Sequence, residues 1–486
     1  MTQMVKVFIS ILLLVYSLMM HSQECSSIYT YGGDVVRYGI NSFNVLGGSV
    51  TNISRYGADP DNADNYLEIQ NAINSSSSTI IFGYKGETYT ISRPLNLISN
   101  KDYVINCEIK LMDGLTSALS EDIASGDTTI LVDEISKFSV GQWIAVTDTN
   151  QLEYYQTDRG WAGKIERISG DTLELDNACP LTITVAHEGR VSHCSPILLA
   201  ENISNITIRG NGTIDGNKSN QDQIHPVYTV GEDENQRSGC GIAIWESEYI
   251  VIKDITVKDC LLHNISISGS DFSNGCNTIN LLSLTVIGGH DKNILVRFTD
   301  SVVVNDCAVT GALWEDGLIF YNFVTNATVN NLYASENKRA GLNWNSSDNS
   351  GLVATNIIGV NNTFRTLYIT GPDAVFNNVS CTGDGILLAE PTGSYDCSNI
   401  IINTISILNA NQSQMVYFLG GIDNITINDL TIDGCTGIGF KSEDYSGDTN
   451  YPSNVTINRI GISNHTGLTT DISIGSDITF NDFTGL

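Results

Sequence analysis

The chain has 486 residues, a formal net charge of -30 and a hydrophobic content of 41%. This apolar content can build a sizeable core, which excludes a generally disordered chain. Lys and Arg total 24 against 54 Asp and Glu, which argues against nucleic acid as the main partner because phosphate binding needs a basic surface. With 44 Gly, only 8 Pro and abundant Asn, the composition indicates a β-rich, turn-rich protein rather than a helical bundle.

The N-terminus carries a pattern typical of export. Lys6 precedes an apolar run from Val7 to Met20, and polar residues follow. A basic start, a short apolar segment and a small residue near a cleavage point predict a secretory signal peptide over residues 1–22. The alternative, a membrane anchor, needs about 20 apolar residues. We therefore expect a soluble, secreted, extracellular protein with no membrane partner.

The 11 cysteines agree with export, because disulfides persist in an oxidising compartment. No two of them form a Cys-x-x-Cys pair, so the sequence supports no zinc site. Cys179 with Cys194 and Cys381 with Cys397 are candidate local disulfides, and the remaining connectivity stays open. The odd number leaves at least one thiol free or paired between chains.

From about residue 200, one phrase recurs in which apolar and polar residues alternate around an Asn or Asp. Its copies fall at residues 206–208, 250–257, 282–286, 302–309, 327–332, 375–379, 400–407, 425–430 and 455–460. Later copies follow one another at 22 to 26 residues, a period that predicts a β-solenoid. Leucine-rich repeats and WD-type propellers lack support, because their consensus residues are absent. We expect an all-β, right-handed parallel β-helix of about ten coils.

Each coil is expected to carry a second strand after a short turn. These second strands are predicted at residues 263–267, 292–296, 316–320, 340–344, 366–369, 384–388 and 415–418. Equivalent residues of successive coils lie about 4.8 Å apart in a parallel sheet. Residues that align in this register are therefore predicted to be neighbours in space.

The part before residue 196 departs from the repeat. Residues 23–120 are predicted to form an N-terminal cap and the first coils, with a short amphipathic helix at Ile69–Ile73 covering the open end of the solenoid. Residues 121–195 are predicted to form an inserted β module, with strands at 129–132, 143–146 and 172–175. Residues 196–486 are predicted to form the regular parallel β-helix.

Two stretches carry a family resemblance. Tyr56–Ile73, with its Gly-Ala-Asp segment followed by Ile-Gln-x-Ala-Ile, and Asn205–Gly216 are similar to segments of the pectin-lyase-like superfamily of carbohydrate-active β-helix proteins. The nearest resemblance is to polygalacturonase-type glycoside hydrolases. Because this scaffold hosts hydrolases, lyases, epimerases and inert adhesins, the resemblance indicates the fold first and an activity second.

Polygalacturonase-type members place a single Asp, an Asp pair, a His and an Arg-x-Lys before the second strands of four successive coils. The corresponding positions here hold Asp291-Lys292, Glu315-Asp316, Lys338-Arg339-Ala340 and Arg365. The acidic pair and the Arg are thus matched in kind. Lys292 stands where the single Asp aligns, and Ala340 stands where the His aligns.

The residues themselves suggest acid–base chemistry at this corner. Two carboxylates on adjacent coils can divide the roles of proton donor and water activator, and repulsion between clustered acids raises one pKa. We expect Glu315 to be the general acid, and Asp316 together with Asp291 to activate water. The alternative for Asp316 is a structural Asp-Gly turn, which Asp384-Gly385 repeats.

Substrate contacts are predicted along the same corner and on the outward face of the second strands, where aromatic rings and amides suit sugars. The predicted substrate-binding residues are Lys292, Arg297, Tyr321, Arg339, Asn343, Arg365 and Tyr368. Arg339 and Arg365 would bind a carboxylate or sulfate through two hydrogen bonds. The alternative is an ordinary exposed β face, which Tyr and Asn also populate.

Two rival functions stay open. A uronate lyase, or a C5-epimerase, would use Lys292 or Arg339 as base and Tyr321 as acid, with Ca²⁺ on Asp291 and Glu315 neutralising the substrate carboxylate. No metal site is otherwise predicted, and no cofactor is certain.

The third function is a non-catalytic glycan-binding or structural solenoid with stacked asparagines. It agrees with the abundance of Asn-x-Ser/Thr sequons, which indicate a glycoprotein surface: Asn52, Asn202, Asn264, Asn326, Asn345, Asn378, Asn424 and Asn454. The leading prediction is hydrolysis of an acidic extracellular polysaccharide, which is the expected partner. Monomer and homotrimer stay open.

Overall fold

The computed structural model describes residues 28–31, 34–37, 49–151, 158–222, 237–390, 396–443, 451–467, 470–472 and 477–484. The chain divides into Met1–Ser49 and Val50–Leu486. In the first unit, β1 (Ile28–Tyr31) pairs in antiparallel fashion with β2 (Asp34–Arg37). The predicted signal peptide, residues 1–22, lies outside the described residues. Among the described residues, no helix has the length and apolar character needed to cross a membrane.

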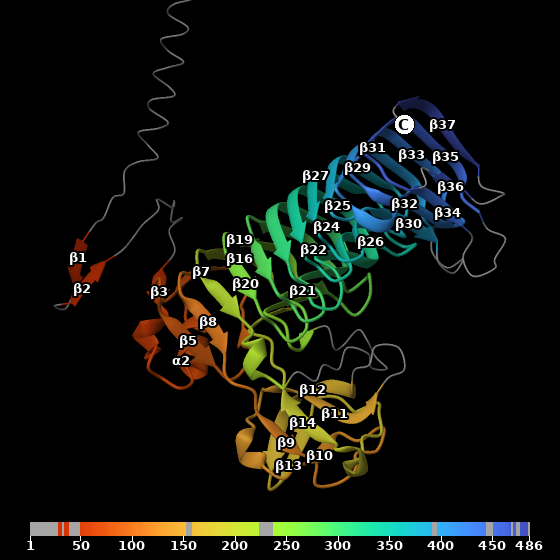
Figure 1. Cartoon of the computed structure of the whole chain (residues 1–486). Helices are drawn as coiled ribbons and strands as arrows, with labels where there is room; N and C mark the ends of the chain where they lie inside the picture. Colours follow the sequence, from red (N-terminus) through yellow and green to blue (C-terminus); the bar gives the residue numbers. More distant parts are fainter. Residues whose placement is uncertain are drawn as a thin grey trace, which may run out of the picture. The chain divides into compact units, whose positions relative to one another are not determined.

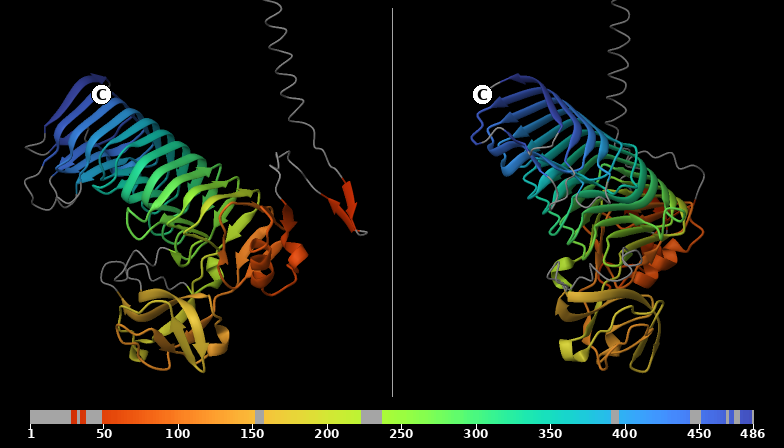
Figure 2. Two further views of the ribbon diagram at one scale, coloured as in Figure 1. Left: turned by 180° about the vertical axis from the view of Figure 1, so that it is seen from behind. Right: turned by 90° about the vertical axis from the view of Figure 1, so that its right-hand side faces the viewer.

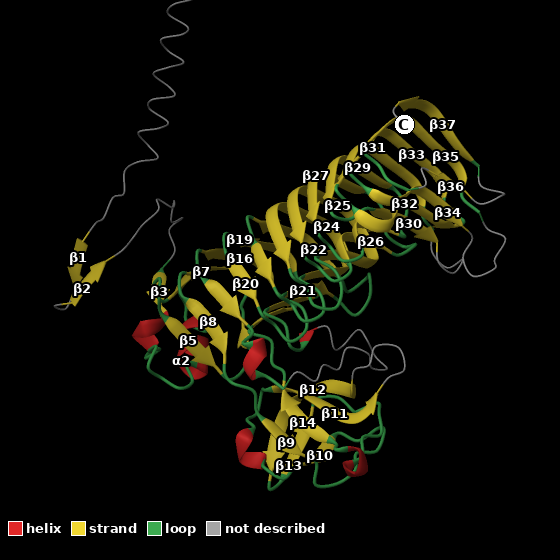
Figure 3. Ribbon diagram, in the orientation of Figure 1, coloured by secondary structure: helices red, strands yellow, loops and turns green. Residues whose placement is uncertain are grey.

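The second unit consists mainly of parallel strands that stack coil upon coil (Figures 1 and 3). One coil runs through β15 (Leu198–Glu201), β16 (Ser204–Gly210) and β17 (Thr213–Asp215). These strands pair in parallel with β18, β19 and β20 of the next coil, respectively. The prediction of a parallel β-helix is confirmed, and the views in Figure 2 show the coils side by side along the solenoid.

The coils continue to the end of the described chain. Their strands are β18 (Ile242–Trp245), β19 (Glu248–Lys253), β20 (Thr256–Lys258), β21 (Ile265–Ser268), β22 (Cys276–Leu282), β23 (Thr285–Ile287), β24 (Ile294–Thr310), β25 (Leu318–Ser335), β26 (Ala340–Asn345), β27 (Leu352–Val360), β28 (Arg365–Ile369), β29 (Ala374–Thr382), β30 (Ile386–Glu390), β31 (Ser398–Leu408), β32 (Asn411–Gly420), β33 (Asp423–Asp433), β34 (Thr436–Glu443), β35 (Ser453–Ser463), β36 (Thr470–Ile472) and β37 (Ile478–Thr484).

The early coils have three strands, whereas the sequence predicts two. The phrase at residues 250–257 is divided at Asp254 into β19 and β20. Asp254 adopts a left-handed backbone conformation that turns the chain and that Asn and Asp tolerate better than most residues. The same corner of successive coils carries Asp254, Ser283, Asp306, Asn331, Asn356 and Asn378, with φ between 53° and 58°. The recurring Asn or Asp is therefore a bend residue.

The interior of the solenoid is a stack of apolar side chains. One column runs through Val296, Phe320, Trp344 and Ile369, which pair in register across four coils. The rings of Phe320 and Trp344 meet edge to face at 5.7 Å. The indole N–H of Trp344 is satisfied by the carbonyl of Pro372 at 2.8 Å. This dry stack fixes which residues of each second strand can point outward.

The N-terminal coils include the predicted helix, α2 (Tyr66–Ile73), whose Ile69, Ala72 and Ile73 are buried in the main core. The surrounding elements are β3 (Val50–Asn52), the 3₁₀ turn η1 (Ile53–Tyr56), β4 (Thr79–Phe82), β5 (Thr88–Ile91), β6 (Leu95–Asn96), β7 (Lys101–Ile105) and β8 (Glu108–Leu111). β6 and β7 pair with β15 and β16, so these residues are continuous with the solenoid.

Between β8 and β15 the chain forms a six-stranded antiparallel sheet with its own core. Its strands are β9 (Thr116–Ala118), β10 (Thr129–Leu131), β11 (Trp143–Gln151), β12 (Asp158–Ser169), β13 (Thr172–Leu175) and β14 (Arg190–His193). The three strands predicted from the sequence correspond to β10, β11 and β13. Gln142 and Trp143 connect the sheet to the solenoid through hydrogen bonds to Ser92 and Ser195.

The predicted disulfides are wrong. Cys194, Cys381 and Cys397 are buried free thiols, so neither predicted local pair exists. Burial raises the pKa of these thiols well above the ordinary value, because a thiolate is poorly solvated there. These cysteines act as small apolar side chains: Cys381 and Cys397 belong to the core of the solenoid, and Cys194 packs with Trp143, Ala145 and Ala162 of the inserted sheet. Cys25 lies outside the described residues.

A ladder of buried amides runs along one corner of the solenoid. Asn264 donates to Asn293, Asn293 to Asn337, Asn337 to Asn362, and Asn362 to Asp384, with distances from 2.8 to 3.1 Å. The same amides also bind backbone groups of the turns before the second strands, such as the N–H of Ala312. The ladder therefore holds successive turns in one register.

Further ladders run along the surface at the bends. Asn331 donates to Asp306, Asn356 to Asn331 and Asn378 to Asn356. Several sequon nitrogens belong to such ladders, including those of Asn326, Asn378, Asn424 and Asn454, and Asn264 is fully buried. A glycan attached at one of these nitrogens would remove its ladder hydrogen bond. Glycosylation at these sites stays a prediction, and it would destabilise the ladder.

We expect Asn337→Ala to lower the free energy of unfolding by about 2–4 kcal/mol, because it leaves several buried hydrogen-bonding groups unsatisfied. The half-exposed ladder residue Asn428, which also donates to the preceding coil, is the matched control. Asn428→Ala should cost less than about 1 kcal/mol, since water replaces the lost bonds. Urea unfolding followed by circular dichroism measures both, and equal costs would contradict a special role for the buried ladder.

Candidate functional site

Backbone hydrogen bonds between three coils bring the predicted charges together. The N–H of Glu315 donates to the carbonyl of Asp291 at 3.0 Å, and the N–H of Arg339 donates to that of Glu315 at 2.9 Å. Lys292 and Asp316 follow Asp291 and Glu315 directly in the turns that lead into β24 and β25. The register predicted from the sequence is confirmed here. We call Asp291, Lys292, Glu315, Asp316 and Arg339 the charged corner.

Lys292 lies at the centre of the charged corner. Its Nζ is 2.6 Å from Asp291 Oδ2 and 2.7 Å from Glu315 Oε2, so one ammonium joins carboxylates of two adjacent coils. Burial opposes the charge of Lys292, but the two carboxylates outweigh this and raise its pKa above the ordinary value. A lysine with a raised pKa is a poor base at neutral pH.

Arg339 completes the other side of the charged corner. Its Nη1 is 3.5 Å from Glu315 Oε1 and 3.9 Å from Asp316 Oδ2, and its guanidinium lies 4.8 Å from the centre of the Tyr368 ring. About a third of the Arg339 side chain is exposed. Arg339 is therefore the cation of the charged corner that an incoming anion meets first.

The charged corner holds three carboxylates and two cations, and the buried imidazole of His263 lies 3.7 Å from Asp291 Oδ2. Burial is the largest influence on its titration. Burial, followed by the effect of Glu315, raises the pKa of Asp291 from 3.8 to about 6, although Lys292 opposes the shift. Burial likewise raises the pKa of Asp316, against the opposing effect of Arg339. Because close carboxylates titrate as a unit, the charged corner takes up a proton in weakly acidic solution.

The three carboxyl groups differ in access to solvent. Asp291 and Asp316 are 2% and 0% exposed, whereas Glu315 retains 9%. Asp316 accepts hydrogen bonds from the N–H of Ala340 and from Asn343 Nδ2, each at 2.9 Å. Glu315 is therefore the carboxylate through which the charged corner meets the outside.

The Asp-Gly turns have a structural cause. A Cβ at Gly317 would lie 2.8 Å from Asn337 Nδ2, and one at Gly385 would lie 2.2 Å from a backbone carbonyl, so only glycine fits beside the ladder. Asp384 is buried, accepts hydrogen bonds from Asn362 and Thr366, and has its pKa raised to about 6 by burial. Asp384 ends the ladder, whereas Asp316 contacts Arg339.

Two predicted substrate-binding residues lie below the surface. Arg297 is 3% exposed, and its guanidinium lies within 5.3 Å of the rings of Phe298 and Tyr321. Asn343 is fully buried beneath the charged corner, where it holds Asp316. More side chains on the outward face of the second strands are buried than the alternating pattern suggests. Of the two predicted aromatic residues, Tyr368 is the one that contacts the charged corner, through Arg339.

Arg365 follows the predicted register, since it pairs with Ala340, but its side chain bonds elsewhere. Its guanidinium donates to the carbonyl of Phe364 and to the amide oxygens of Gln412 and Gln414. Burial lowers its pKa to about 10. The hydrogen bonds of Arg365 to Gln412 and Gln414 therefore connect it to a later coil rather than to the acids of the charged corner.

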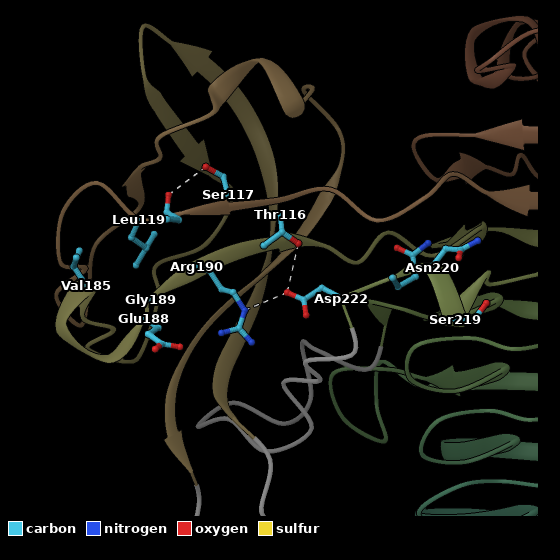
Figure 4. Close-up of a pocket in the computed structure, with 12 residues that line it drawn as sticks. Thr116, Ser117, Leu119, Val185, Glu188, Gly189, Arg190, Ser219, Asn220 and Asp222 are labelled. Atoms are coloured by element: carbon cyan, nitrogen blue, oxygen red, sulfur yellow. Dashed lines mark hydrogen bonds and ion pairs between the residues drawn. The ribbon is translucent and has the colours of Figure 1, made fainter.

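A separate cavity of about 860 Å³ lies between the inserted sheet and the segment Ser219–Asp222 (Figure 4). Its most prominent charges neutralise each other, because Arg190 Nε donates to Asp222 Oδ2 at 3.2 Å and Thr116 and Ser192 donate to the same oxygen. None of the predicted site residues lines it. We therefore place the candidate site at the charged corner.

The charged corner does not fit a calcium site at Asp291 and Glu315. Calcium needs several oxygen ligands around one point, whereas the Lys292 ammonium bridges these two carboxylates. Among the described residues, no group of three or more His, Cys, Asp or Glu side chains is arranged to hold a metal ion.

Sequence reasoning missed two exposed aromatic side chains beside the charged corner, Trp314 and Phe364, and it aligned the exposed Lys338 with this corner without assigning it a role. Trp314 directly precedes Glu315, and Phe364 donates its N–H to the carbonyl of Arg339 at 3.1 Å. The position of an aromatic residue directly before an acidic pair could have indicated a binding surface. The sequence alone does not show whether the next coil covers that turn, so the pattern does not by itself predict an exposed ring.

The catalytic domain of a GH87 alpha-1,3-glucanase in complex with nigerose is 12% identical, with a TM-score of 0.51 over 93% of this chain and 72% of the other. The A-module of the mannuronan C-5 epimerase AlgE4 of Azotobacter vinelandii is 13% identical, with a TM-score of 0.46 over 89% and 100%. A tailspike of an Acinetobacter baumannii bacteriophage, in complex with capsular saccharide, is 10% identical, with a TM-score of 0.41 over 89% and 79%.

The chain is a right-handed parallel β-helix protein. This agrees with the resemblance of the sequence to the pectin-lyase-like superfamily, while the polygalacturonase-type resemblance stays a prediction. No protein-family model and no curated protein matches the sequence of this β-helix.

We expect Asp291→Asn to reduce the pH dependence of stability of the β-helix. Since the folded pKa of Asp291 is raised to about 6, the folded state binds a proton more tightly than the unfolded state. This contribution therefore stabilises at low pH and is lost as the pH rises toward 6. The difference in unfolding free energy between variant and wild type should change by about 1–3 kcal/mol between about pH 4 and pH 7.

Lys292→Met should have the opposite effect on the pH dependence, because it removes the cation that lowers the pKa of Asp291. Its stability should fall more steeply than that of wild type over the same pH range. Thermal unfolding at a series of pH values measures all three proteins. Parallel pH profiles would show that the charged corner does not titrate as described.

Proposed function

We propose that this chain is an exported enzyme that hydrolyses glycosidic bonds of an acidic polysaccharide at the charged corner. The observation that carries the proposal is the excess of carboxylates in the charged corner: three acids against two cations, largely buried, with Glu315 the most exposed of the acids at 9%. Such perturbed titration in a partly open cluster is typical of catalytic sites. The saccharides bound to the glucanase and tailspike neighbours support a polysaccharide partner.

Glu315 is the general acid. The proton that the charged corner takes up near pH 6 is shared among coupled carboxyl groups, and Glu315 is the one that can pass it to a glycosidic oxygen. The carboxylate of Glu315 lies 2.7 Å from Lys292 Nζ and 3.5 Å from Arg339 Nη1. An anionic sugar that pairs with Arg339 weakens its hold on Glu315, so the substrate itself promotes protonation of the acid.

Asp316 and Asp291 are the carboxylates that orient water and stabilise positive charge on the sugar ring. Lys292 fills the space between Asp291 and Glu315, so a water molecule is excluded from that gap. Asp316, whose oxygen lies 3.9 Å from Arg339, is therefore the better partner for Glu315. Asn343 positions Asp316 without touching the substrate.

β-Elimination or C5-epimerisation of a uronate is the second candidate, and one contact favours it. Arg339 lies against Tyr368, and this pair supplies a cation for the substrate carboxylate and a hydroxyl for proton transfer. An assignment of Lys292 as base and Tyr321 as acid is less suitable. Lys292 is held between carboxylates, and the Tyr321 ring lies against Arg297.

The proposal is tested by incubating the protein with polygalacturonate, alginate and sulfated galactans while following reducing ends and ultraviolet absorbance. Wild type should release reducing ends without absorbance, and faster below about pH 6 than above it, because the acid form is required. Glu315→Gln and Asp316→Asn should lower the rate at least about 100-fold.

Glu336→Gln is the matched control, because Glu336 is an exposed acid of a neighbouring turn, and it should retain the wild-type rate. A rise in absorbance that depends on Tyr368 would replace hydrolysis by elimination. No product from any polymer, with the protein folded, would contradict the enzyme and favour the non-catalytic solenoid.

A further inference from the structure

The coil that carries Glu315 is longer at the charged corner than the coil that follows it. Lys338 and Arg339 are consecutive residues, yet their N–H groups donate to the carbonyls of Ala312 and Glu315, each at 2.9 Å. Leu313 and Trp314 therefore have no counterpart in the next coil. With nothing stacked on that side, they form a step at the edge of the charged corner.

This step exposes a tryptophan, whereas the other tryptophans of the chain are buried. Trp314 is 41% exposed and Leu313 is 50% exposed. The other four tryptophans, Trp143, Trp161, Trp245 and Trp344, are at most 5% exposed. Exposing a tryptophan forgoes a large apolar contribution to folding, so its place next to Glu315 calls for a function.

The Trp314 ring is held from behind. It stacks on the imidazole of His290 in the preceding coil, with ring centres 5.8 Å apart and planes 27° from parallel. His290 is 8% exposed, and burial lowers its pKa to about 4, so the ring is neutral under ordinary conditions. Stacking on the neutral His290 ring fixes the orientation of the Trp314 indole. This lowers the entropy cost when a ligand binds to the indole.

A second aromatic residue lies on the far side of Arg339. Phe364, 37% exposed, meets the ring of Tyr368 edge to face at 5.8 Å and lies under the guanidinium of Arg365 at 4.8 Å. Phe364 and Trp314 belong to coils two steps apart, about 10 Å along the solenoid. Exposed Lys338 and part-exposed Arg339 lie in the coil between them.

We propose that Trp314 is the platform on which a pyranose ring of an acidic polysaccharide stacks, with Lys338 and Arg339 binding the acid group of the sugar chain. Phe364 supports the neighbouring sugar unit. The apolar C–H face of a pyranose suits an indole, and the two cations select an anionic sugar. The platform sets which glycosidic bond lies over Glu315. This inference rests on the proposed polysaccharide substrate but does not require hydrolysis.

Binding is measured in the Glu315→Gln protein, which holds the ligand uncleaved, with oligogalacturonate and oligoalginate as probes and a neutral dextran oligosaccharide as comparison. Because Trp314 is the exposed tryptophan, an acidic oligosaccharide should shift its fluorescence and protect it from acrylamide quenching. By calorimetry, Trp314→Ala should weaken binding about 10-fold and Trp314→Phe about 3-fold.

Leu313→Ala is the matched control, because it removes exposed apolar surface from the same step without removing an aromatic ring. It should bind within about 2-fold of the parent. In an active protein, Trp314→Ala should raise KM and leave kcat nearly unchanged, as expected for loss of binding common to ground and transition states.

The outcomes separate this inference from the proposed function. Suppose that the oligosaccharide protects Trp314 from quenching and that Trp314→Ala weakens binding, while no reducing ends are released. This result would uphold the platform and contradict hydrolysis. Hydrolysis with unprotected Trp314 and an unchanged KM in Trp314→Ala would overturn the platform. Self-association abolished by Trp314→Ala, with no oligosaccharide bound, would instead make the step a contact between copies.

Discussion

Parallel hydrogen bonding between successive coils is the constraint on which the rest of the molecule depends. It turns residues about 25 positions apart in sequence into neighbours roughly 5 Å apart. A cluster of charged side chains therefore forms from equivalent positions of successive coils rather than from one specific loop. The ladder from Asn264 to Asp384 strengthens this register beside the charged corner. Displacement of a turn by one residue would carry Glu315 away from Asp291 and Arg339.

A buried group of five charges is costly, and its arrangement shows how the cost is limited. Each cation contacts two carboxylates, and backbone and amide groups satisfy Asp316. Replacing such a network by apolar side chains of the same size is often neutral or stabilising. The surplus negative charge is the part that stability does not explain. It creates a group that takes up a proton near pH 6, which acid catalysis can use.

The sequence predicts the coil register well, because hydrophobic alternation and period are local and repeated. That register brings Asp291, Glu315 and Arg339 together as expected. Sequence could not show which outward positions are covered, because cover depends on turns of variable length. Arg297 and Asn343 were therefore expected at the surface and are buried. The disulfides failed for a related reason: an inward cysteine and an outward one look alike until the direction of each side chain is known.

Variation in turn length also explains where a repetitive solenoid acquires a specific site. Where successive coils are equal, the backbone of each turn bonds to the turn before it, as Leu313 does to Gly289 and Glu315 to Asp291. Where the coil after Glu315 is shorter, Leu313 and Trp314 stay uncovered, and the charged corner gains an edge against which a ligand can be placed. The same shortening brings Lys338 and Arg339 close to Glu315. The insertion that looks like an irregularity in the repeat is thus what makes one turn chemically different from the others.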